Sequence, residues 1–308
     1  MAEPTVAILL CTFNSVRFLN TQLASYAAQT YPHWSLQVND DGSTDATREL
    51  LKAFAAAQGE HAVVVHEGPR IGFERNFLNL ACRPDLHADY YAFSDHDDVW
   101  YADKLARAVA MLRTVPAARP AIYCSSSELI DEHGVHLGYS QNFAKRPSFA
   151  NALVQSIGGG NTMVFNEAAR QLLVAGGDAQ LVPSHDWWLY QLVTGAGGVV
   201  HYDPRPTIAY RQHGCNVAGV NRGLRASLER IRYLITGRFK RWNQMNCEGL
   251  ARVASLLTEE NRACLAQFAT ARDARMIPRL RGLRKSGIYR QTPLGNLGIT
   301  AAALLKRI

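Results

Sequence analysis

Three carboxylates crowd the end of an apolar run. The run Tyr90–Phe93 is short and apolar, which is typical of a buried strand, and Asp95, Asp97 and Asp98 follow it. Strand alternation would place Asp95 and Asp97 on the same side, where their charges require a cation. Mg²⁺ and Mn²⁺ take oxygen ligands and keep positions open for phosphate, so the spacing predicts a metal site that holds a nucleotide diphosphate. The alternative is a solvated acidic turn before a helix that begins near Tyr101.

A further acidic residue, Asp186, precedes two tryptophans. Ser184 or the turn before it can cap a helix, which places Asp186 in the first helical turn. Trp187 and Trp188 could offer a stacking surface for a sugar, and an apolar wall raises the pKa of a carboxyl group. Both features suit a general base that removes a proton from a hydroxyl. The residues alone fit equally well an aspartate that only stabilises the helix dipole.

The preceding elements would bring such residues to one edge of a sheet. Apolar runs at 6–11, 36–38, 62–66 and 90–93 alternate with amphipathic segments. This β-α-β alternation predicts an α/β fold with a mostly parallel sheet flanked by helices. Ligands of such sheets bind at the carboxyl ends of the strands. Polar residues at these ends include Thr12, Asp40, Asp41, Arg70, Asp95 and Asp97.

Several common sequence motifs and targeting patterns are absent from the sequence. No Gly-x-Gly-x-x-Gly follows the first strand and no phosphate-loop lysine motif occurs, so metal and carboxylates must hold the phosphates. No apolar run reaches 18 residues, and the start of the chain lacks the pattern of a signal peptide. The cysteines are scattered without a Cys-x-x-Cys pair, which argues against a disulfide framework or a zinc ribbon. These features predict a cytoplasmic protein.

Charge divides the chain into two parts. Residues 1–221 hold 15 Lys and Arg against 21 Asp and Glu, whereas residues 222–308 hold 18 against 5. This shift predicts a nucleotide-binding domain over 1–221 and a basic C-terminal extension over 222–308, with helices expected near 224–235, 247–269 and 299–308. Basic helices can bind an anionic membrane peripherally, on the inner face of the cell membrane, or simply pack on the body; both interpretations stay open. No nucleic-acid reader motif accompanies the charge, so no nucleic-acid partner is expected.

Three motifs in order resemble one enzyme family. Val6–Asn14, Asp40–Asp45 and Ser94–Trp100 together look like an inverting family 2 glycosyltransferase of the GT-A fold, over roughly residues 5–220. The form Ser-Asp-x-Asp-Asp-x-Trp resembles the rhamnosyltransferase-like branch that builds bacterial surface polysaccharides such as lipopolysaccharide. That branch often has Gln where this chain has His96, a departure with little consequence if the side chain points away from the metal.

The resemblance implies ligands and roles for particular residues. It implies a nucleotide-sugar donor such as dTDP-rhamnose or a UDP-sugar, a divalent metal, Mg²⁺ or Mn²⁺, and a glycan or polyprenyl-linked acceptor. Asp186 would be the catalytic base. Residues expected to bind the nucleotide sugar are Thr12, Phe13, Asn14, Asp40, Asp41, Arg70, Asp95, Asp97 and Arg211. Those expected at the metal are Asp97, Asp95 and His213, and those expected beside the acceptor or donor sugar are Gly160, Asn161, Trp187 and Trp188.

Two other functions remain as alternatives. A sugar-nucleotide nucleotidyltransferase shares the sheet and the acidic ligands, but it needs a basic glycine-rich loop near the N-terminus, which Thr12–Asn14 is not. A non-catalytic glycan- or membrane-binding module would have no use for an intact Asp97 together with Asp186.

Overall fold

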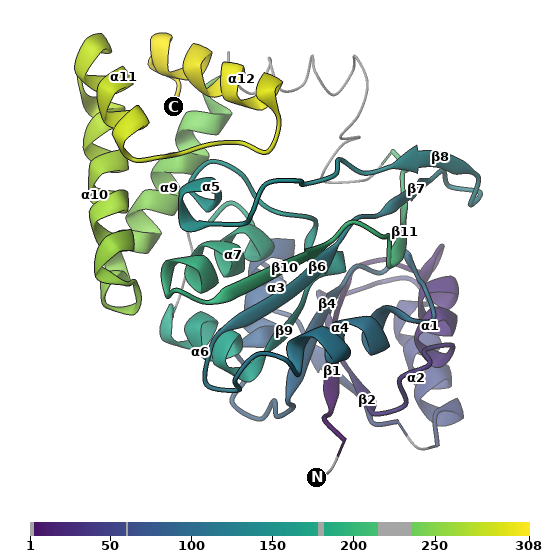
Figure 1. Cartoon of the computed structure of the whole chain (residues 1–308). Coiled ribbons are helices and arrows are strands. Elements are labelled where there is room, and N and C mark those ends of the chain that lie inside the picture. The colour runs from purple at the N-terminus through teal and green to yellow at the C-terminus, as the bar shows by residue number, and fades with distance from the viewer. Residues whose placement is uncertain (1–2, 60, 178–181, 215–235) are drawn as a thin grey trace.

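The chain folds around a large, mostly parallel sheet (Figure 1). The computed structural model describes residues 3–59, 61–177, 182–214 and 236–308. Within these ranges the larger sheet has the order β10-β6-β9-β4-β1-β2-β3, and all of its pairs are parallel except those of β9. Its strands are β1 Val6–Thr12, β2 Trp34–Asp40, β3 Val63–Glu67, β4 Tyr90–Ser94, β6 Ala121–Ser125, β9 Val164–Asn166 and β10 Val199–Asp203. The predicted α/β class and the four N-terminal parallel strands are confirmed.

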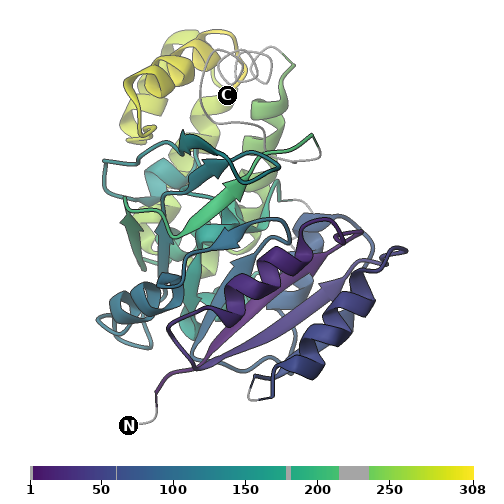
Figure 2. The same cartoon turned by 90° about the vertical axis from the view of Figure 1, so that its right-hand side faces the viewer.

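Alternate residues of β1 enter two separate cores, as expected for a central strand with both faces covered. Val6, Ile8 and Leu10 pack with α1 Leu19–Ala27, α2 Thr47–Ala57 and α4 Lys104–Leu112. In Figure 2, α1 and α2 lie along this face. The other face packs against α3 Phe73–Ala81, α5 Phe149–Ala152, α6 Glu167–Ala175 and α7 His185–Gly195.

A smaller sheet places the acidic turn beside a distant part of the chain. It has the order β5-β11-β7-β8, with bounds β5 Val99–Trp100, β7 Glu128–Ile130, β8 His136–Tyr139 and β11 Ile208–Arg211. Strand β11 is antiparallel to β5 and parallel to β7. Because β5 directly follows Asp98 and β11 ends at Arg211, this pairing brings the two segments together.

The segment that contains Gly160 and Asn161 forms a short helix followed by a strand. Gly160–Thr162 form a short 3-10 helix, η1, and Val164–Asn166 continue as the antiparallel strand β9 between β4 and β6. A strand of three residues carries too little periodicity to be recognised from the sequence.

The C-terminal region is helical and packs on the body. Its elements are α9 Arg238–Arg252, η2 Ala254–Leu256, α10 Glu259–Asp273, α11 Met276–Lys285 and α12 Pro293–Leu304. The single helix expected over 247–269 is wrong, because Thr258 caps a new helix by accepting a hydrogen bond from Asn261 N. Apolar residues of these helices join the same core as α7.

The expected helix at 224–235 and the domain boundary at 221/222 lie outside the described residues. Among the helices that are described, none has the length and apolar character needed to cross a membrane.

Candidate active site

Three acidic side chains converge in the turn between β4 and β5. Ligand oxygens of Asp95, Asp97 and Asp98 all lie within 4.8 Å of one another. Strand β4 ends at Ser94, so strand alternation is not what aligns Asp95 with Asp97; the turn itself brings them together. The expected helix near Tyr101 begins at Lys104, so these carboxylates do not cap it. A cluster of carboxylate oxygens is a donor set that suits Mg²⁺ or Mn²⁺.

The charges in this cluster disfavour one another when no cation is bound. Burial and the neighbouring charges of Asp97 and Asp186 raise the pKa of Asp95 to about 7. Burial, then Asp97 and Asp95, also raise the pKa of Asp98 well above its usual range. The charge of Asp186 is one cause of the raised pKa of Asp95, so these two carboxylates interact electrostatically. A bound divalent cation would relieve this repulsion.

Asp98 is already engaged by protein donors. Asn161 Nδ2 donates to Asp98 Oδ2 at 2.6 Å, and Arg211 N donates to Asp98 Oδ1 at 3.1 Å. The side chain of Asp98 is fully buried, and Asp97 is nearly so. Asp95 and Asp97 are therefore the members of the cluster with more capacity for a cation.

A buried lysine that the sequence did not reveal as functional lies beneath the cluster. Lys104 is fully buried, donates to Asn161 O, and places its Nζ 4.0 Å from the centroid of the Trp100 ring. Burial lowers the pKa of Lys104 to about 7, while Asp98 and Asp95 act in the opposite direction. One signal was available: Lys104 occupies the buried face of α4, four residues before Ala108.

His213 and Arg211 approach the cluster from β11 and the residues after it. His213 Nε2 lies 2.7 Å from Asp97 Oδ2, so the imidazole contacts a predicted metal ligand. Arg211 Nε donates to Asp97 O at 2.9 Å, and its Nη1 donates to the carbonyls of Asp131 and Glu132. These bonds give Arg211 a role in fixing the acidic turn. The metal contact of His213 and the diphosphate contact of Arg211 stay predictions.

Asp40 and Asp41, at the end of β2, have different hydrogen-bond partners. Asp40 is fully buried and accepts hydrogen bonds from Thr12 Oγ1, from the amide and hydroxyl of Ser43, and from Arg48 Nε. These donors offset the effect of burial and hold its pKa below the usual value. Asp40 therefore supports the turn, and Arg48 was missed because an arginine in a predicted helix has no distinctive sequence signal.

Asp41, by contrast, faces the loop before α3. Arg70 N donates to Asp41 Oδ1 at 2.5 Å, from a residue whose backbone φ is +57°. The side chain of Arg70 is 67% exposed, and Phe13 at the end of β1 is 58% exposed. Asn14 Oδ1 accepts a hydrogen bond from Thr44 N, which joins the first and second motifs. Asp41, Arg70 and Phe13 thus lie at the ends of neighbouring strands and loops, with surface available to a ligand.

Asp186 is tied to the acidic cluster through two consecutive residues. Gly160 N donates to Asp186 Oδ2 at 3.1 Å, and Trp187 N donates to Asp186 Oδ1 at 2.7 Å. The next residue after Gly160, Asn161, holds Asp98. The helix η1 therefore links the candidate base to the candidate metal site.

Gly160 permits a close approach that a side chain would prevent. A Cβ at Gly160 would lie 2.6 Å from His185 Nε2 and 3.2 Å from Asp186 Cβ. His185 is buried, stacks on Phe77 with 4.1 Å between ring centroids, and has a pKa lowered to about 4 by burial. The ring of His185 therefore has little room to move.

Replacing Gly160 by Ala should consequently displace η1 or His185. We expect the free energy of unfolding to fall by about 1–3 kcal/mol, and the sugar transfer that the resemblance implies to fall at least about tenfold, because Asp186 would move. Denaturant unfolding and steady-state kinetics measure the two effects. Gly59→Ala is the matched control, since a Cβ there meets nothing within 4 Å. Wild-type transfer by Gly160→Ala would contradict the positioning role of η1.

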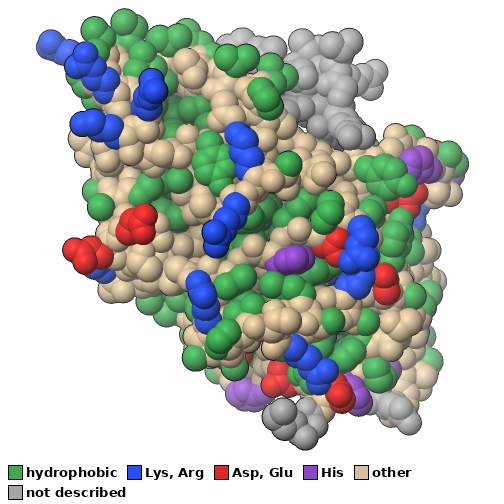
Figure 3. All heavy atoms as spheres, in the orientation of Figure 1, with side chains coloured by type: hydrophobic (Ala, Val, Ile, Leu, Met, Phe, Trp, Pro, Cys, Tyr) green, Lys and Arg blue, Asp and Glu red, His purple; other side chains and the backbone are tan. Residues whose placement is uncertain are grey.

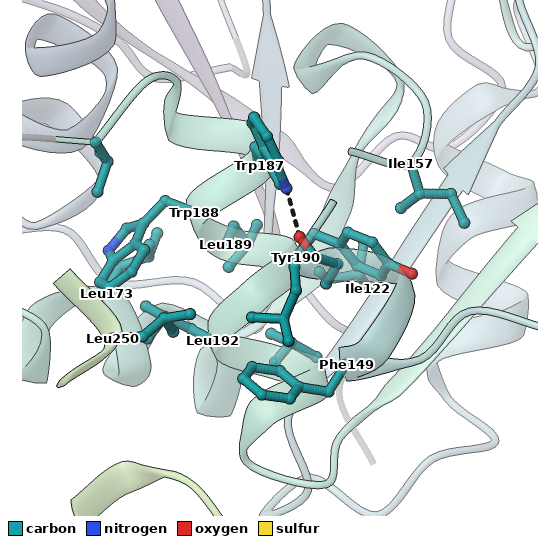
Figure 4. Packing of buried hydrophobic residues seen from close by; sticks show 14 of the residues in the cluster. Ile122, Phe149, Ile157, Leu173, Trp187, Trp188, Leu189, Tyr190, Leu192 and Leu250 are labelled. Atoms are coloured by element: carbon teal, nitrogen blue, oxygen red, sulfur yellow. Dashed lines mark hydrogen bonds between the residues drawn. The ribbon is translucent and has the colours of Figure 1, made fainter. Parts of the chain in front are cut away.

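The expected indole wall beside Asp186 is wrong. Trp187 and Trp188 are 6% and 1% exposed and belong to the hydrophobic core, where Figure 4 shows them among Leu173, Leu192 and their neighbours. Trp187 Nε1 donates to Ala152 O at 2.6 Å. Successive residues of a helix point about 100° apart, so residues that follow Asp186 turn away from it. Neither indole can stack on a sugar in this arrangement.

Known proteins are similar to this chain in sequence and in fold. Residues 7–173 match the family model Glycosyl transferase family 2. The chain is 28% identical over 232 residues to dTDP-rhamnosyl transferase RfbG of Shigella flexneri, covering 72% of this chain and 78% of that protein. It is 28% identical over 112 residues to UDP-Glc:alpha-D-GlcNAc-diphosphoundecaprenol beta-1,3-glucosyltransferase WfgD of Escherichia coli, covering 36% of this chain and 42% of that protein.

A solved structure extends the likeness to nearly the whole chain. Mannosyltransferase PcManGT from Pyrobaculum calidifontis, in complex with GDP-Man and Mn²⁺, matches with a TM-score of 0.51 at 18% identity, over 99% of this chain and 86% of that one. At this identity the match shows the fold, which is GT-A. The family model covers more than half of the 308 residues and includes the acidic turn and η1. The resemblance found in the three motifs is thereby confirmed, and the chain belongs to glycosyl transferase family 2.

Proposed function

We propose that the protein is a metal-dependent inverting glycosyltransferase that transfers a sugar from a nucleotide-diphosphate donor to a glycan or polyprenyl-linked acceptor in surface-polysaccharide synthesis. The observation that carries this proposal is the link from the acidic cluster through Asn161 and Gly160 to Asp186. This link supports the proposal because hydrogen bonds from consecutive residues join the candidate base to the candidate metal ligands.

The metal would be Mg²⁺ or Mn²⁺, held by Asp97 and Asp95 with His213 beside Asp97. When bound, the cation would offset the negative charge that develops on the leaving diphosphate. Asp98, Asn161 and Arg211 would hold the ligand turn in place through the hydrogen bonds described above. The Mn²⁺ in the mannosyltransferase PcManGT supports this assignment by likeness of fold.

The nucleoside of the donor would lie across the ends of β1, β2 and β3. Asp41 would accept a hydrogen bond from the base, since Asp40 is already occupied by four protein donors. Thr12, Phe13, Asn14 and Arg70 would complete this part of the site. We propose a pyrimidine nucleotide sugar, with dTDP-rhamnose favoured over a UDP-sugar by the likeness to RfbG.

Asp186 would act as the general base. A carboxylate offers about four lone-pair positions, and the amides of Gly160 and Trp187 use two, so an acceptor hydroxyl can still donate to it. The hydroxyl proton would pass to Asp186 while the acceptor oxygen bonds to the anomeric carbon. The bond from that carbon to the diphosphate would break, with its electron pair leaving on the diphosphate. One displacement of this kind inverts the anomeric centre.

The acceptor is proposed by chemical class. WfgD is named for a diphosphoundecaprenol-linked acceptor, and this likeness favours a polyprenyl-linked oligosaccharide for the present protein. Such an acceptor resides in a membrane, so the proposal includes peripheral contact with an anionic membrane surface.

A donor panel tests the proposal directly. Purified protein with Mn²⁺ is mixed with dTDP-rhamnose, UDP-glucose, UDP-GlcNAc and GDP-mannose, and thermal shift and release of nucleoside diphosphate are measured. We expect stabilisation and turnover with one pyrimidine donor and neither without metal. Pyrophosphate release from a nucleoside triphosphate and a sugar 1-phosphate, with no donor turnover, would instead identify a nucleotidyltransferase.

A further inference from the structure

Helix α12 is mostly apolar, with Asn296 and Thr300 as its polar side chains, and it lies at the surface (Figure 1). The segment Pro293–Leu304 contains no charged residue, and its inner face is buried against the body. Its outer face carries Leu294 and Leu297, each 66% exposed, followed by the exposed Leu304 and Leu305. A helix with this little polar surface is normally covered by other parts of a protein or by a partner. Within the described part of the chain, nothing covers the outer side of α12.

The start of α11 extends this apolar surface. Arg279 of α11 donates from Nη1 to Ala303 O at 2.7 Å, which fixes the first turn of α11 beside the last turn of α12. Met276 and Ile277, which are exposed, belong to this first turn of α11. We call these residues the outer apolar face: Met276, Ile277, Leu294, Leu297, Leu304 and Leu305.

Positive charge predominates around the outer apolar face, and the nearest acidic residue along the chain is Asp273, three residues before Met276. Asp273 is the last acidic residue of the chain. On the face that Figure 3 shows, the end of the molecule formed by α11 and α12 presents hydrophobic, Lys and Arg side chains and no Asp or Glu. Exposed cations on or beside these helices are Arg275, Arg281, Arg284, Lys285, Lys306 and Arg307.

We propose that this surface docks the protein on an anionic lipid bilayer. The leucines would enter the headgroup region while the cations contact lipid phosphates, a combination that an amphiphilic anionic surface satisfies. A second copy of the chain fits less well, because two faces of the same charge repel each other. The docking surface rests on the proposed membrane-linked acceptor, since it would hold the enzyme at the interface where that acceptor resides.

Vesicle sedimentation of the full chain tests the proposal. We expect more protein to sediment with vesicles of phosphatidylcholine and phosphatidylglycerol than with phosphatidylcholine alone, and less at high salt. The double variant Leu294→Asn, Leu297→Asn should bind anionic vesicles at least about tenfold more weakly. The double variant Arg281→Glu, Lys285→Glu should also bind anionic vesicles at least about tenfold more weakly. On neutral vesicles it should bind as the wild type does.

Two exposed residues elsewhere provide matched controls. Leu137→Asn replaces a leucine that is 57% exposed on β8, and Lys52→Glu reverses an exposed charge on α2. Both should bind vesicles as the wild type does. Circular dichroism and donor turnover confirm that each variant is folded.

The outcomes separate docking from catalysis. Equal sedimentation of all variants, or a wild-type dimer that the leucine double variant dissociates, would overturn the membrane assignment even if donor turnover persists. Conversely, salt-sensitive vesicle binding by a protein that turns over no nucleotide sugar would leave the docking surface intact and remove the proposed function.

Discussion

Asp186→Asn should lower the rate constant of sugar transfer by about a thousandfold while donor affinity stays within a few-fold of the wild type. The variant keeps the size of the side chain and loses its ability to accept the proton of an acceptor hydroxyl. The amide oxygen can still accept from one of the two backbone donors, Gly160 N or Trp187 N, and keep the side chain in place, so the loss should appear in kcat rather than in donor binding. Transfer kinetics and calorimetry with the donor measure the two quantities.

The control for this variant is Asp103→Asn. Asp103 also stands at a helix N-terminus, before α4, but its carboxylate is exposed and faces Arg107. An amide in place of Asp186 cannot accept from both backbone donors, so a modest loss of stability is expected and thermal unfolding must be followed in parallel. If Asp186→Asn transferred sugar at the wild-type rate, the base would have to be another residue.

The parallel core of the sheet follows from simple patterns. The runs that became β1, β2 and β4 are apolar because both faces of the central part of the sheet are covered, and their alternation with helices fixes parallel pairing. Strand β3 lies at the edge of the sheet and stays partly exposed. Strand β9 could not be predicted in this way, because it lies antiparallel between β4 and β6, which are distant from it in the sequence. The break between α9 and α10 depends on one threonine cap, a local signal hidden within a helical stretch.

Site residues on strand ends were easier to predict than those on helices. Asp95, Asp97 and Asp98 do converge, although a turn rather than strand alternation aligns them. The error over Trp187 and Trp188 has a physical cause, since composition reveals aromatic neighbours but not which side of a helix is covered. Helix α7 is buried almost all round, so its aromatic residues had to enter the core.

Removal of the metal is the second change with a large expected effect. Chelation should abolish donor binding, and Asp97→Asn should weaken both Mn²⁺ affinity and kcat/KM by at least about a hundredfold, since changing even an indirect metal contact costs 10- to 100-fold. His96→Gln is the matched control within the same turn, because His96 does not belong to the oxygen cluster. We expect it to bind Mn²⁺ and donor as the wild type does.

Measurements of protein stability distinguish the loss of a metal ligand from damage to the fold. Without metal, burial and then the neighbouring carboxylates raise the pKa of Asp95 and of Asp98, so removing the charge of Asp97 should leave the metal-free protein as stable as the wild type or more so. Mn²⁺ at a hundredfold excess over its dissociation constant should stabilise the wild type by about 2.7 kcal/mol and the variant far less. Equal stabilisation of both proteins by Mn²⁺ would place the cation elsewhere.

Because η1 ties Asp186 to Asp98, Mn²⁺ should also protect the amides of Gly160 and Asn161 from hydrogen exchange in the wild type but not in Asp97→Asn.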